Sequence, residues 1–130
     1  MTDDVERDAR RLKPIIAAIA QTGGSGLLAL AGIEPSVPDR VPEVYPDLVH
    51  AEDWATAVDV CGRWVSDDDA LAFGREFCLF GNADELVARM RAIGAAGATS
   101  FLIQHVGSYD LPVALMEEVG AAVLPRLADG

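Results

Sequence analysis

CLFGNADELVARM, residues 78–90, and AAGATSFLIQH, residues 95–105, are the stretches that decide the expected fold. The first opens with a short apolar run that ends at Gly81, and Asn82 with Glu85 three residues later has the pattern of a capping box, which starts a helix. Thr99 to His105 is β-favouring and lies between glycines. The order strand, helix, strand predicts an α/β repeat with parallel strands.

The helix expected after Asn82 carries Leu86, Val87, Met90 and Ile93 on one face, and Gly94 or Gly97 ends it. A last helix is expected from about Leu111 to Leu127. Pro125 should end or bend this helix near its C-terminus. The inward-facing positions would be Leu115 or Met116, then Val119, Val123 and Leu127.

The chain upstream of these stretches is expected to be helical. Val5, Ala9, Leu12, Ile16 and Ile19 follow each other at helical spacing and form one apolar stripe, within which Pro14 either kinks the helix or begins a new one. Four prolines make residues 32–50 an irregular but ordered covering loop. Residues 51–65 resume helical spacing.

The boundary between the two expected parts falls at Ser66, an N-cap residue with Asp69 three positions on. Residues 1–65 form a helical region with the Pro-rich loop at 32–50, and residues 66–130 form a C-terminal βαβα module. The expected fold class is therefore α/β.

Composition excludes several classes of function. Ten Lys and Arg against 21 Asp and Glu give a formal net charge of −11, which repels nucleic acids and anionic membranes. No apolar run approaches the roughly 20 residues that span a bilayer. The N-terminus lacks the features of a secretory signal, so we expect a cytoplasmic protein, with Cys61 and Cys78 as reduced, partly buried residues.

The order of motifs in residues 79–103 resembles the closing module of luciferase-like, flavin- or deazaflavin-dependent oxidoreductases. In that family a short strand ends in a glycine and a small polar residue, a helix with an acidic first turn follows, and a glycine leads into the eighth strand of a TIM barrel. The late pair Leu124-Pro125 also matches, as do Arg11-Leu12-Lys13-Pro14 and the loop of residues 45–50 upstream. The resemblance implies a partial TIM barrel.

The resemblance also implies a cofactor, FMN or coenzyme F420, at the C-terminal mouth of the barrel. The residues that follow the two expected strands would contact it. These cofactor-binding candidates are Gly81, Asn82, Gln104, His105 and Gly107. Asn82 has an alternative role as an N-cap, and His105 as a hydrogen-bonded, half-buried imidazole.

A complete barrel needs about 250 residues, and this chain has 130. We therefore expect the C-terminal segment or subunit of such an oxidoreductase, not catalytically complete alone, whether as a natural subunit, a remnant or a truncated reading frame. A homo-oligomer or a partner chain would supply the missing barrel strands. The alternative is a non-catalytic α/β interaction module that oligomerises or pairs with a barrel-bearing partner through its sheet edge.

Other sites find little support. The two histidines and two cysteines lack the spacing of a metal site. Gly24 to Ala29 fits the G-x-G-x-x-A form of a dinucleotide fingerprint, but the Ala-rich segment before it favours helix where the fingerprint requires a strand. No serine, cysteine or lysine has the setting of an activated nucleophile.

Overall fold

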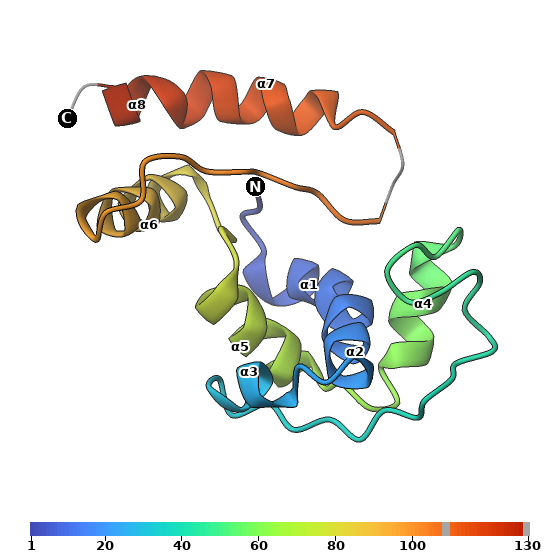
Figure 1. The fold of residues 1–130 in the computed structure, drawn as a ribbon. Coiled ribbons are helices and arrows are strands. Elements are labelled where there is room, and N and C mark those ends of the chain that lie inside the picture. Colours follow the sequence, from blue (N-terminus) through green and yellow to red (C-terminus); the bar gives the residue numbers. More distant parts are fainter. Residues whose placement is uncertain (108–109, 129–130) are drawn as a thin grey trace. The chain divides into compact units, whose positions relative to one another are not determined.

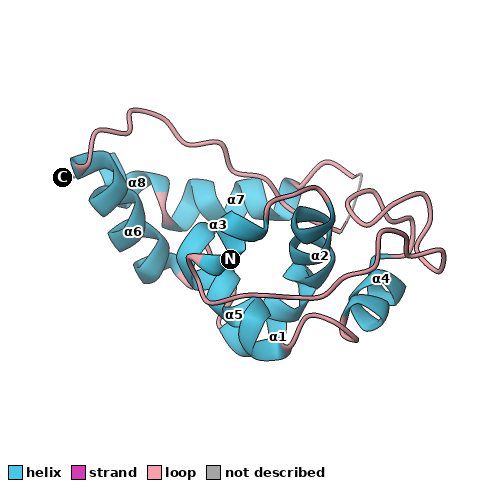
Figure 2. Cartoon of the chain, turned by 60° about the horizontal axis from the view of Figure 1, so that its bottom comes forward, coloured by secondary structure: helices cyan, strands magenta, loops and turns pink. Residues whose placement is uncertain are grey.

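The structure is a computed structural model that describes residues 1–107 and 110–128, and all the regular elements in those residues are helices (Figures 1 and 2). The expected α/β class, with a partial TIM barrel and a βαβα module, is therefore wrong for the described chain. The two segments expected to be strands, residues 78–80 and 99–105, are irregular. Residues 108–109 and 129–130 of the expected module lie outside the described residues.

The two expected strands are missing because their backbone groups have no strand to pair with among the described residues. A strand exists only where a neighbouring strand accepts and donates its hydrogen bonds. Within the described residues, no backbone hydrogen bond joins residues 99–105 to another segment. The β-favouring side chains are present, but the chain supplies no paired neighbour, and the helices around them satisfy their own backbone groups.

The chain forms two compact units, and each is described by itself. One comprises Glu6–Cys78 with Val106–Ser108, and the other comprises Met1–Val5, Leu79–His105 and Tyr109–Gly130. We call them the N-terminal unit and the C-terminal unit. The division follows Cys78, whereas the sequence patterns placed a boundary at Ser66.

The N-terminal unit contains α1 (Val5–Ala9) except for its first residue, the 3-10 helix η1 (Arg10–Leu12), α2 (Lys13–Gln21), α3 (Ser25–Ala29), α4 (Trp54–Cys61) and α5 (Asp67–Phe77). Pro14 lies in the first turn of α2, so the chain restarts a helix there, which was one of the two expected outcomes. Three residues of the expected stripe, Ala9, Leu12 and Ile16, are buried, whereas Val5 and Ile19 are half-buried. The segment resembling a dinucleotide fingerprint forms α3 after another helix.

The Pro-rich loop covers part of this unit. Val41, Val44 and Leu48 are buried, as is Ile33 at the start of the loop. The Gln21 side-chain amide donates to the Pro38 carbonyl at 2.6 Å. The ordered, covering character expected for residues 32–50 is therefore confirmed.

The C-terminal unit contains α6 (Ala83–Ala95), α7 (Val113–Ala122) and α8 (Leu124–Ala128). Its buried apolar cluster is formed by residues of α6, of α7 and of the junction after α7: Leu86, Val87, Met90, Val119 and Val123. Leu79, Ala83, Phe101, Leu115 and Leu127 pack against the cluster while partly buried. Residues 98–105 of this unit run beside α7 (Figures 1 and 2).

The last expected helix is broken as Pro125 suggested. α7 ends at Ala122, and α8 begins at Leu124 with Pro125 in its first turn. Leu115 rather than Met116 packs inward, and Met116 is exposed. Gly97, with φ of +110°, takes the left-handed conformation just beyond α6.

Candidate functional site

Gly81 and Asn82 have structural roles in the C-terminal unit. The Asn82 side chain accepts a hydrogen bond from the Glu85 backbone, and the Glu85 carboxylate accepts one from the Asn82 backbone, so the expected capping box is confirmed. Gly81 has φ of +142°, and a Cβ at this position would collide with the Glu85 carboxylate. Its carbonyl accepts a hydrogen bond from the Thr2 backbone at 2.9 Å.

Gln104 and His105 lie in the irregular segment of the same unit, Gln104 exposed and His105 half-buried. Neither is joined to Gly81 or Asn82 by a hydrogen bond or ion pair in the residues that the structure describes. The segment does not bring the four candidates into one hydrogen-bonded group.

Gly107 belongs to the N-terminal unit, where it packs on Trp54. A Cβ on Gly107, whose φ is +88°, would lie 2.8 Å from Cδ1 of the Trp54 indole. The same indole donates to the Arg11 carbonyl, and Arg11 donates to the Val106 carbonyl at 3.2 Å. The close approach of the Trp54 indole explains why residue 107 is a glycine, and no bound ligand is needed to account for it.

These residues do not fit the phosphate of a flavin or deazaflavin. The Glu85 carboxylate lies against the Gly81–Asn82 loop and takes its backbone N–H group, which is the donor that a phosphate would need. A second anion there would meet like charge. Cofactor binding by these residues stays a prediction from the resemblance, and no chemical step follows from it.

The buried charge in the N-terminal unit is Lys13, on the first turn of α2. Its ammonium lies 2.6 Å from a carboxylate oxygen of Asp67, which also pairs with Arg10 at 2.9 Å. The hydrogen bond from Lys13 holds the pKa of Asp67 below its usual range. The ion pair ties α2 to the start of α5.

Cys61, at the end of α4, has no exposed surface. Burial raises the pKa of this thiol to about 11, and the charge of Lys13 opposes the rise only in part. A thiol in this state is protonated at neutral pH and is a poor nucleophile. Cys61 therefore serves as a small apolar core residue.

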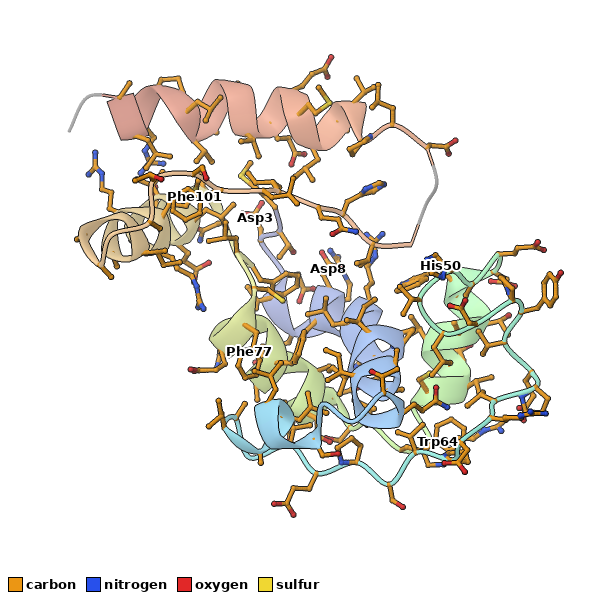
Figure 3. The ribbon with its side chains drawn as sticks, viewed as in Figure 1. Asp3, Asp8, His50, Trp64, Phe77 and Phe101 are labelled. Atoms are coloured by element: carbon orange, nitrogen blue, oxygen red, sulfur yellow. The ribbon has the colours of Figure 1, made fainter. Side chains whose placement is uncertain are left out.

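The Pro-rich loop outlines an open hollow of about 430 Å³, lined in part by Arg40, Tyr45 and Asp47. On its rim Asp47 pairs with His50 at 2.9 Å, and the hydrogen bond from His50 lowers the pKa of the Asp47 carboxyl. Both side chains are exposed (His50 is labelled in Figure 3). In residues 1–107 and 110–128 no buried polar side-chain atom lacks a partner, so no orphan group points to a ligand in this hollow.

Two further findings concern metals and membranes. Over the described ranges, no group of three or more His, Cys, Asp or Glu side chains is arranged to hold a metal ion. None of the helices in that part of the chain combines the length and apolar character needed to cross a bilayer.

The C-terminal unit exposes apolar side chains that the unit itself does not cover. Leu102 is 90% exposed, Leu111 72% and Met116 58%. Ile103 and Val113 are also exposed. We call these five residues the neutral surface, because Asp110 is the only formally charged residue in the sequence between Arg91 and Glu117.

Phe101 is the one partly buried residue among residues 101–104, and the three residues that follow it are exposed. Phe101 packs beside α6 against the buried cluster (Figure 3), whereas Leu102 and Gln104 are exposed. Residues 99–105 also lack backbone partners among the described residues. The segment thus offers both apolar side chains and hydrogen-bonding backbone groups.

The sequence pattern identified the β-favouring segment but not the exposed apolar positions on α7 and just before it. Leu111 was placed in a helix whose inner face was assumed to be covered, and Val113 was not considered. The available signal was the long interval between Arg91 and Glu117 with a single charge, in a chain where charged residues are otherwise frequent.

Comparisons with protein-family models, with curated proteins and with solved structures give no match to this chain. The likeness to luciferase-like oxidoreductases rests on the motifs alone.

Proposed function

We propose that the chain is a non-catalytic protein-association module that pairs with a second copy of itself through the neutral surface. The observation that carries the proposal is the exposure of Leu102, at 90%, together with that of the other four apolar residues. Scattered apolar residues are ordinary on a protein surface, whereas a group of them on neighbouring segments is typical of an interface.

The charge distribution supports a second copy as the partner. Each copy carries −11, so most of the surface repels an identical chain. The neutral surface is where two copies can approach with least repulsion. A two-fold interface places the same patch on both partners, which suits these five residues because none of them carries a charge.

The remaining clusters support a non-catalytic role. Lys13 with Asp67 joins two helices, Asn82 with Glu85 caps a helix, and Cys61 fills the core. Each of these groups has a structural partner or environment inside one unit. We place the dimer in the cytoplasm, where Cys61 and Cys78 stay reduced.

Leu102→Asp tests the proposal directly. Leu102 is almost fully exposed, so the aspartate leaves the core of the unit intact but puts an unpaired carboxylate into the proposed interface. We expect the dimer dissociation constant, measured by sedimentation velocity over a range of concentrations, to rise on the order of a hundredfold, because burial of a lone charge costs several kcal/mol.

Leu30→Asp is the matched control, because Leu30 is 76% exposed and lies in the N-terminal unit just after α3. We expect this variant to associate as the unmodified protein does. Equal effects of the two substitutions would contradict the proposal, as would a protein that is monomeric at all concentrations. A titration with FMN and with coenzyme F420 completes the test, since quenched flavin fluorescence would favour the oxidoreductase assignment instead.

A further inference from the structure

We infer that two copies pair by aligning residues 99–105 as antiparallel β-strands about a two-fold axis at Leu102. The inference rests on the proposed function and adds the manner of association. The segment that the sequence marks as a strand would then find, in a second chain, the neighbour that its own chain does not provide.

The first support is the backbone of the segment. Residues 99–105 run beside α7 without a backbone hydrogen bond to any other described segment. Exposed backbone groups of this kind accept an added strand, which supplies main-chain hydrogen bonds and places alternate side chains on the two faces.

The second support is the difference in exposure between the neighbouring residues Phe101 and Leu102. Phe101 packs against the cluster of the C-terminal unit, and the neighbouring Leu102 points away from it with 90% of its surface exposed. Neighbouring side chains of a strand point to opposite faces in the same way, and Ile103, at 36% exposed, is less exposed than Leu102.

The register follows from symmetry. In a symmetric antiparallel pair, opposite residues lie on the same face, so the axis must pass through a residue and not between two residues. An axis at Leu102 places Leu102 opposite itself and Phe101 opposite Ile103. It also places Ser100 opposite Gln104 and Thr99 opposite His105, so that apolar residues meet apolar ones and polar residues meet polar ones.

The two adjacent registers are less favourable. An axis at Phe101 would place Leu102 opposite Ser100, and an axis at Ile103 would place Leu102 opposite Gln104. Each also pairs fewer of the seven residues. The segment contains no Lys, Arg, Asp or Glu, so no like charges oppose each other in the pairing we infer.

Cysteine cross-linking tests the register in the full chain. Leu102→Cys should form a disulfide-linked dimer rapidly under mild oxidation, because directly opposite residues have Cα atoms about 5 Å apart, within reach of a disulfide. Gln104→Cys, on the same exposed face, should not link to its own copy, since the two positions would lie about 13 Å apart along the strands. A mixture of Ser100→Cys and Gln104→Cys chains should give the mixed dimer. Mass spectrometry separates these links from any made by Cys61 or Cys78.

Sedimentation of the unmodified protein, run alongside, tests whether a dimer forms at all, and the cross-links test whether the dimer pairs residues 99–105 as strands. A dimer that links equally well at positions 102 and 104, or at neither, would overturn the strand pairing and leave the proposed function intact. A protein that stays monomeric would overturn both. A dimer with the link at position 102 and the mixed link between positions 100 and 104 supports the inference.

Discussion

Lys13 is the one charged residue among those described that is buried, and Asp67 is its carboxylate partner. Asp67 itself is half-exposed, so water screens part of the attraction. The contribution of the pair depends mainly on keeping the buried ammonium from being left without a counter-charge.

Asp67→Asn should therefore lower the free energy of unfolding by about 1 kcal/mol, between the values for exposed and buried ion pairs. Asp68→Asn is the matched control, because Asp68 is in the same first turn of α5 and interacts with the same helix dipole but is not paired with Lys13. Urea unfolding measures both. If both variants lost the same free energy of unfolding, the ion pair between Lys13 and Asp67 would contribute nothing to stability.

The same pair predicts a dependence on pH. Lys13 lowers the folded-state pKa of Asp67, so its contribution is fully present above the unfolded-state value of about 4 and is lost as pH falls through the folded-state value. The difference in stability between the unmodified protein and Asp67→Asn should shrink in acid. A difference that stays constant would contradict this linkage.

At the scale of helices, α6 begins at an Asn82 capping box, with a glycine before it that no other residue could replace without strain. The Asn82 side chain satisfies a backbone N–H group that the helix itself leaves unpaired. The capping role accounts for Asn82 at this position without a cofactor.

Asn82→Ala should accordingly lower the free energy of unfolding by about 1 kcal/mol, and Asn82→Asp should retain most of the stability because aspartate is an equally good cap. Chemical denaturation followed by circular dichroism measures the change. If alanine proved neutral, the cap would be unimportant and the ligand role implied by the resemblance would gain support.

The elements that could be predicted from the sequence are those whose signals are local. Ser66 with Asp69 and Asn82 with Glu85 mark helix starts through contacts three residues apart, and Pro14 and Pro125 mark starts through their own geometry. Both helix starts at capping boxes were therefore predicted. For Pro14 the pattern left a kink and a new helix as alternatives, and Pro125 was expected to end or bend the last helix and not to begin one.

The strands could not be predicted in the same way, because a strand depends on a distant partner. Thr99 to His105 has suitable side chains, and yet no described segment pairs with it. The candidate surface was missed for a related reason. The pattern of α7 shows that one face is apolar, but Leu115 and Met116 cannot be assigned to the covered or the uncovered side from spacing alone.

At the scale of the whole molecule, a strongly acidic chain exposes five apolar residues, the neutral surface. Two copies at −11 each repel, and the attraction comes from apolar side chains that salt does not weaken. Added salt shortens the range of the repulsion from about 10 Å at 0.1 M to about 3 Å at 1 M. Association should therefore strengthen as salt is added, the opposite of a dimer held by ion pairs.

Sedimentation equilibrium of the unmodified protein at low and at high salt tests this claim most directly. The account predicts an average mass that rises with protein concentration from 13.7 kDa toward twice that value, and at lower concentrations when the salt is high. A mass that stays at 13.7 kDa under every condition would contradict it, and so would a dimer that salt dissociates.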